Sequence, residues 1–146
     1  MKIALKYGLL ITLVVILWVV IVRFLMNTGP DSKLNLGAPL LFNIAAFLSI
    51  FLGIRERKRQ IGDRFSFKEG MRTGFAISLV YALSSCLFFV VEYLIAGPKL
   101  LMSEAGLQSR PPWQVALMAY AGLFLGALVF GIIYSALSAF FLVRQR

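Results

Sequence analysis

The chain has 146 residues, of which 60% are hydrophobic and 14% are charged, and its formal net charge is +9. This composition lies outside the range of soluble globular domains, so lipid must be the main solvent of the protein. A basic net charge often indicates nucleic-acid binding. Here the basic residues flank apolar segments instead, and we expect no nucleic-acid partner.

Four apolar stretches are long enough to cross a bilayer, which takes about 20 helical residues. They predict helices over about 7–26, 36–54, 67–96 and 113–143, with a basic cytoplasmic loop over 55–66. The expected fold is all-α, a single domain (1–146) built as an integral membrane bundle of four transmembrane helices. The first stretch is longer than a cleavable signal segment and lacks small residues at its end, so we expect it to remain in the mature protein.

The loop segments carry clear turn and capping signals. Residues 27–32 (NTGPDS) form a turn cluster that predicts a short connection between the first two helices. Ser66 and Glu69 fit a capping box, which predicts that the third helix begins near Phe67. Gly97-Pro98 should end this helix, and Pro111-Pro112 should precede the fourth.

The basic residues are distributed unevenly along the chain. Seven of the fifteen Lys and Arg residues lie between Arg55 and Arg72, two precede the first helix, two follow the last, and four remain for the other loops. The positive-inside rule therefore predicts that the central loop and both termini are cytoplasmic. A basic side chain near an anionic leaflet contributes about 1 kcal/mol. The candidate contacts for anionic lipid headgroups or an acidic partner are Arg55, Arg57, Lys58 and Arg59; a purely topogenic role is the alternative.

Small residues recur every four positions in the third and fourth helices. Such stripes allow close helix packing in lipid, where apolar side chains gain little from meeting each other. They predict contact between these two helices, although the same stripes suit a homo-oligomer or another membrane-protein partner. The stripe residues are Gly70, Gly74, Ser78 and Ala82 in the third helix, and Ala127, Gly131, Ser135 and Ala139 in the fourth.

Glu92 is the one acidic residue within an apolar segment. A charge in hydrocarbon costs several kcal/mol, so an intramembrane acid is a candidate functional residue. Ser85 shares its helix face, while Arg23 and Asn43 come from other helices at a similar depth. Together they form a candidate intramembrane polar site. The alternative is that Glu92 and Arg23 lie close enough to helix ends to reach the interface without any function.

The residue inventory excludes most reaction centres. The chain has no histidine and one cysteine, which removes zinc and haem ligation as well as Ser/His and Cys/His catalytic pairs. No two carboxylates occur within apolar segments to form an aspartyl dyad. We therefore expect no enzymatic activity, no metal and no cofactor.

Several sequence features resemble one protein family. They are the Lys-rich start leading into YGLL, the pattern IFLGIRERKRQIGDRFSFKEGMRTGF, and the hydropathy of four helices. On these features the chain resembles domain-of-unknown-function family 4199 (DUF4199), small bacterial four-helix membrane proteins. The resemblance implies a bacterial cytoplasmic (inner) membrane protein and carries no activity or functional residue.

Two classes of function fit these expectations. The first is a structural or interaction subunit whose basic loop contacts anionic lipid or an acidic partner. The second is a small oligomeric transporter or channel that uses Glu92 as an ion- or proton-coupled site.

Overall fold

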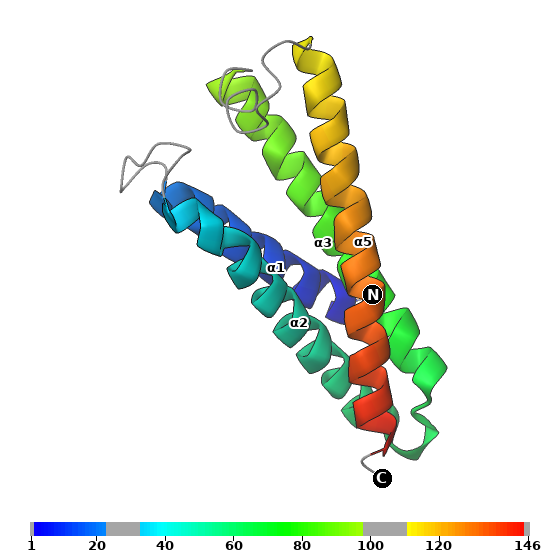
Figure 1. Cartoon of the computed structure of the whole chain (residues 1–146). Helices are drawn as coiled ribbons and strands as arrows, with labels where there is room; N and C mark the ends of the chain where they lie inside the picture. Colours follow the sequence, from blue (N-terminus) through cyan, green and yellow to red (C-terminus); the bar gives the residue numbers. More distant parts are fainter. Residues whose placement is uncertain (1, 23–32, 98–110, 145–146) are drawn as a thin grey trace.

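The computed structural model describes residues 2–22, 33–97 and 111–144, and nearly all of these residues are helical (Figure 1). Four long helices follow one another: α1 (Lys2–Val20), α2 (Lys33–Ile61), α3 (Phe67–Ala96) and α5 (Pro112–Arg144). A short 3-10 turn, η2 (Gly62–Arg64), lies between α2 and α3. The described part of the chain is therefore all-α, as the apolar segments predict.

In the described ranges, four helices are long and apolar enough to cross a membrane: Lys2–Val20, Gly37–Arg64, Phe67–Ile95 and Pro112–Arg144. A helix satisfies its own backbone hydrogen bonds, which is why helices can span hydrocarbon. Large apolar side chains such as Leu94 and Ile95 are 75% and 81% exposed on the helix surfaces. Exposure on this scale fits lipid as the surrounding solvent and confirms the expectation of four membrane helices.

The segment expected to be a basic loop over 55–66 is mostly helical. α2 continues seven residues past Ile54 to Ile61, and Gly62 then turns the chain with a φ of +63°. Arg, Glu, Lys and Gln are strong helix formers, so the end of the apolar run does not end the helix. The first described helix also starts earlier than expected, at Lys2. Its expected end at residue 26 lies outside the described residues.

The start of α3 matches the predicted capping signal in one of its two hydrogen bonds. The backbone N–H of Glu69 donates to Ser66 Oγ at 3.3 Å, which satisfies one of the free donors of the first turn. The Glu69 carboxylate contacts Arg57 instead of returning to the Ser66 backbone. Half of the capping box is therefore formed, and the other half is replaced by a contact between helices.

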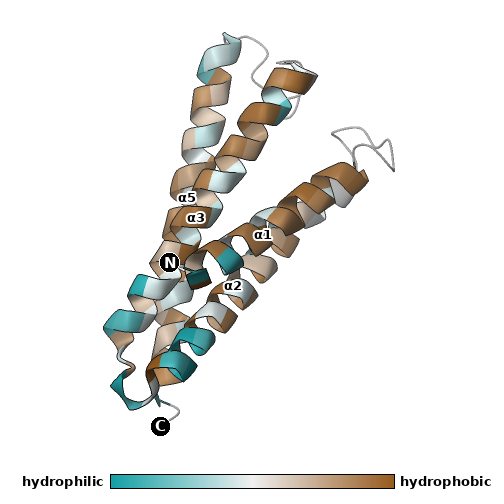
Figure 2. Ribbon diagram, turned by 180° about the vertical axis from the view of Figure 1, so that it is seen from behind, coloured by the Kyte–Doolittle hydropathy of each residue, from teal (hydrophilic) through white to brown (hydrophobic). Residues whose placement is uncertain are grey.

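The helices form two antiparallel hairpins, α1 with α2 and α3 with α5, as both views of the molecule show (Figures 1 and 2). The hairpins cross near η2 and the C-terminus and diverge towards the opposite end. The most extensive contact between elements is that of α3 with α5, followed by α1 with α3. Four fully buried isoleucines from α1, α2 and α3 belong to one core cluster: Ile11, Ile50, Ile54 and Ile77.

The small-residue stripes of α3 and α5 face each other. A Cβ atom built on Gly70 would lie 2.6 Å from the Cβ of Ala139, and one on Gly74 would lie 2.6 Å from the Cβ of Ser135. No side chain fits at these separations. The two backbones therefore approach as closely as their glycines allow, which is how small residues hold helices together in lipid.

The same stripes continue towards the diverging end. A Cβ atom on Gly131 would overlap the side chain of Ser78, and Ala82 is fully buried. Ala127, Gly131 and Ser78 also line a cavity between the hairpins. Close packing of the glycines thus extends from Gly70 to Gly131, while Gly122 and Gly126, further towards the diverging end, have no atom within 4 Å of a built Cβ.

Candidate functional site

The cationic residues predicted to contact lipid lie on the last turns of α2. Arg55 directly follows Ile54, whose side chain is 0% exposed, and Arg59 lies one turn further along the same helix face. Hydrophilic residues gather at this end of the bundle, around η2 and the start of α3 (Figure 2). Arg55 therefore stands at the boundary between the apolar core and the polar end; we refer to this region as the basic end.

The four candidate cations differ in their partners. Arg57 Nη2 lies 3.5 Å from Glu69 Oε2, and Lys58 Nζ donates to the backbone oxygen of Leu142 at 2.6 Å. The second contact satisfies a carbonyl in the last turns of α5, where a positive charge is also favoured by the helix dipole. Arg55 and Arg59 are exposed and form no ion pair or hydrogen bond with the described residues. Two of the four cations thus have structural partners and two face outward.

A cavity of about 570 Å³ opens between the ends of α2 and α5. Its cationic residues come from α2, while its apolar wall contains Phe65 and Leu142, each 3% exposed. The sequence offered no signal for this wall, because α5 reaches α2 through the crossing of the hairpins. The lining residues are Arg55, Lys58, Arg59, Gly62, Asp63, Phe65, Leu142 and Val143.

A second acid at the basic end is held between α1 and α2. Glu56 Oε2 accepts hydrogen bonds from Lys6 Nζ and Tyr7 Oη, both at 2.8 Å. Lys6 Nζ also lies 4.9 Å from the centre of the Tyr7 ring. Partly exposed ion pairs of this kind contribute little to stability. Their consequence for the charge of the basic end matters more. Lys6 compensates the negative charge of Glu56, so Glu56 does not neutralise Arg55 or Arg59.

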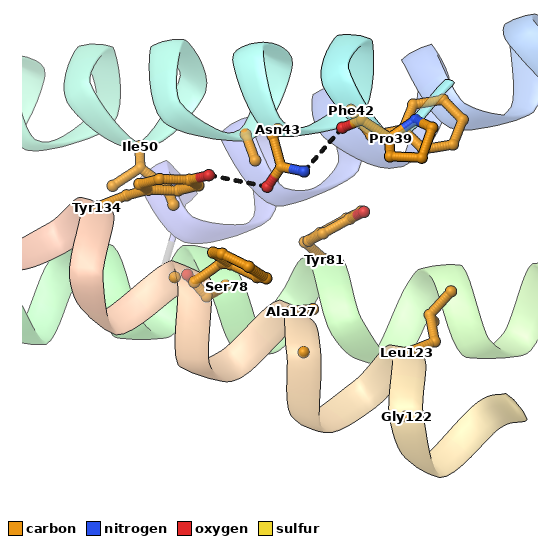
Figure 3. Close-up of a pocket in the computed structure, with 14 residues that line it drawn as sticks. Pro39, Phe42, Asn43, Ile50, Ser78, Tyr81, Gly122, Leu123, Ala127 and Tyr134 are labelled. Atoms are coloured by element: carbon orange, nitrogen blue, oxygen red, sulfur yellow. Dashed lines mark hydrogen bonds between the residues drawn. The ribbon is translucent and has the colours of Figure 1, made fainter. Parts of the chain in front are cut away.

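Asn43 joins the two hairpins through a hydrogen bond. Its Oδ1 accepts from Tyr134 Oη at 2.8 Å, and its Nδ2 donates to the backbone oxygen of Pro39 at 2.7 Å (Figure 3). Both residues line a cavity of about 230 Å³, to which Ser78 and Tyr81 of α3 also contribute. Tyr134 was not among the predicted site residues. The sequence feature that could have identified it is a phenolic hydroxyl within an apolar helix, because a buried tyrosine hydroxyl needs a hydrogen-bond partner.

The other members of the predicted polar site do not meet Asn43. Ser85 is 1% exposed and its Oγ has no hydrogen-bond partner among the described residues. Glu92 is half-buried further along α3, and neither side chain lines the cavity beside Asn43. Arg23 lies outside the described residues. The described structure therefore does not assemble one polar site from these residues.

Four long apolar helices with a charged end define a multi-pass membrane protein. Within the described ranges, no three His, Cys, Asp or Glu residues are grouped to hold a metal ion. Residues 6–105 match the family described as protein of unknown function (DUF4199). This match spans more than half of the chain, and the protein therefore belongs to the DUF4199 family, as its residue pattern indicated. No curated protein and no solved structure gives a significant match.

Proposed function

We propose that this protein is a non-catalytic membrane subunit whose basic end binds anionic lipid headgroups. The observation that supports this most is the exposure of Arg55 and Arg59, one turn apart, immediately beyond the buried Ile54. Each basic side chain near an anionic leaflet contributes about 1 kcal/mol, and the attraction falls off within a Debye length. The proposal places the basic end and both termini on the cytoplasmic side of a bacterial inner membrane, in keeping with the positive-inside rule.

The proposal can be tested with the full chain purified in a mild detergent. Native mass spectrometry would compare retention of phosphatidylglycerol and phosphatidylcholine with identical acyl chains. We expect the anionic lipid to be retained several-fold more than the zwitterionic one, and the difference to shrink as salt is raised. Equal retention of both lipids would contradict the proposal. An acidic protein partner would then be the remaining occupant for the basic end.

The alternative function, a small oligomeric transporter using Glu92, has weaker geometric support. Glu92 and Ser85 do not line the cavity that contains Asn43, so this cavity does not join the members of the expected polar site. Ion or proton flux in vesicles containing the protein, lost in Glu92→Gln, would favour this function over the first.

A further inference from the structure

We propose that the cavity between α2, η2 and α5 binds the phosphate headgroup of a single phospholipid of net negative charge. This inference rests on the proposed function and adds a defined site, a stoichiometry and a headgroup class to it. Diffuse attraction between a basic surface and a leaflet requires none of these three. A defined site requires that particular residues hold the phosphate and that others contact the lipid beyond it.

Arg55 and Arg59 supply the phosphate contacts. Residues four apart lie on the same face of a helix, and both side chains line this cavity. A guanidinium group presents a planar fork of donors that matches phosphate oxygens in pairs. Since neither arginine has an ion-pair partner among the described residues, both forks are available to an incoming anion.

Lys58 fixes the shape of the site. Its hydrogen bond to the Leu142 backbone oxygen, 2.6 Å long, ties the end of α5 to the turn of α2 that carries both arginines. It also offsets the partial negative charge of the α5 C-terminus, which would otherwise repel a phosphate. This contact helps to keep the cationic side and the apolar side of the cavity in register.

The apolar wall favours a lipid over a soluble anion. Val143 is half-buried and presents apolar surface to the cavity, and Phe65 and Leu142, each 3% exposed, lie behind it. Arg55 follows the last buried residue of the α2 apolar run, and the proposal sets it at the depth of the lipid phosphates, where basic residues flank a membrane helix. A phospholipid can meet both surfaces at once, with its phosphate at the arginines and its glycerol or acyl carbons on the wall.

The charges that line the cavity favour a headgroup of net negative charge. Three cations and one acid, Asp63, face it, so the balance is positive. A zwitterionic headgroup carries a cation as well as a phosphate. The two exposed arginines repel that cation. Phosphatidylglycerol brings the phosphate without that cation, and its hydroxyl groups are able to donate to a carboxylate oxygen.

The test uses the full chain in detergent and counts bound lipids by native mass spectrometry at limiting phosphatidylglycerol. We expect one lipid to be retained preferentially. Arg55→Gln/Arg59→Gln should lower this retention about tenfold, which corresponds to a loss of about 0.7 kcal/mol per arginine, within the order of magnitude expected near an anionic leaflet. The matched control is Arg64→Gln/Lys68→Gln, which removes the same charge from exposed residues outside the cavity and should lower retention by less than twofold.

The outcomes separate the two proposals. Equal losses in both double variants would show diffuse attraction, so the defined site would fail while the proposed function would stand. No preference for phosphatidylglycerol in the unmodified chain would overturn both. Displacement of the lipid by an equal concentration of soluble glycerol phosphate would show that the apolar wall adds nothing, and would overturn the lipid assignment.

A conservative variant guards against misfolding. Arg55→Lys/Arg59→Lys keeps the charge and the helix propensity but removes the guanidinium forks. We expect it to retain the helical circular dichroism of the unmodified chain and to bind phosphatidylglycerol at an intermediate level. Retention equal to that of the unmodified chain would show that charge alone suffices, and would overturn the role of the arginine forks.

Discussion

At the scale of single residues, the glycines of α5 occupy contrasting environments. A Cβ atom on Gly131 would overlap Ser78, whereas one on Gly122 would have no atom within 4 Å. Both glycines are in the same helix, where glycine has the same unfavourable helix propensity at either position. Any difference between equivalent substitutions at the two positions therefore reports the packing of α3 against α5.

We predict that Gly131→Leu destabilises the protein much more than Gly122→Leu. Overpacking a tight contact costs about 1–3 kcal/mol or more, because α3 and α5 must move apart. The open position has no such cost. Reversible unfolding in mixed detergent micelles, followed by circular dichroism, measures both losses. Equal losses at the two positions would contradict the close contact between the stripes.

The hydroxyl of Tyr134 offers a second test at this scale, because it links α5 to Asn43 on the other hairpin. We predict that Tyr134→Phe lowers the free energy of unfolding by about 0.6 kcal/mol, the average for hydrogen bonds between membrane helices. In a double-mutant cycle, the losses from Tyr134→Phe and Asn43→Ala should not add. Tyr120→Phe is the control, since that hydroxyl bonds within its own hairpin, to Phe89 O at 3.1 Å. A Tyr120–Asn43 coupling as large as the Tyr134–Asn43 coupling would argue against the link.

At the scale of helices, the sequence predicted some boundaries closely and others poorly. The range expected for the third helix, 67–96, is that of α3, and the fourth was expected over 113–143 where α5 spans Pro112–Arg144. Serine and proline signals mark these boundaries locally. The apolar run of α2 marks where its surroundings change from lipid to water, but a helix rich in Arg, Lys and Glu continues through that change.

The sequence pointed to the cationic residues of the candidate site but not to its apolar wall or its geometry. Charge clustering identified Arg55 and Arg59, and the structure places both on one cavity. The contacts that occupy Arg57 and Lys58 come from Glu69 and from the end of α5, which are distant in sequence. Such pairings depend on how the hairpins cross. Neither hydropathy nor local spacing contains that information.

The end of α2 gives a prediction at the scale of this helix. Gly62 has a φ of +63° and open space around it, so a substitution there meets backbone strain and no steric clash. We predict that Gly62→Ala costs about 1–2 kcal/mol, the penalty of the left-handed conformation for an alanine. Gly62→Asn should cost less, because asparagine tolerates this region better. Thermal unfolding of both variants measures the difference; equal stability of all three proteins would contradict a fixed turn at Gly62.

At the scale of the whole molecule, the basic end and the diverging end lie at opposite ends of the bundle (Figures 1 and 2). The proposed orientation predicts which end an impermeant maleimide reaches in intact cells. In a Cys86→Ala background, Pro111→Cys should react from outside, and Gln60→Cys should react only after lysis. Both positions are exposed in the structure, so a missing reaction reflects sidedness. The reverse pattern would overturn the orientation.

The divergence of the hairpins also affects how the protein sits in a bilayer. The hairpins are close at the basic end and diverge towards the other. With the bundle spanning a bilayer in the proposed orientation, we expect it to occupy less area in the leaflet at the basic end than in the opposite one. A cone-shaped inclusion fits a curved membrane better than a flat one, so its insertion energy depends on curvature. We therefore expect vesicle radius to change the fraction of protein inserted in each direction, with the wide end favoured in the outer, expanded leaflet of small vesicles.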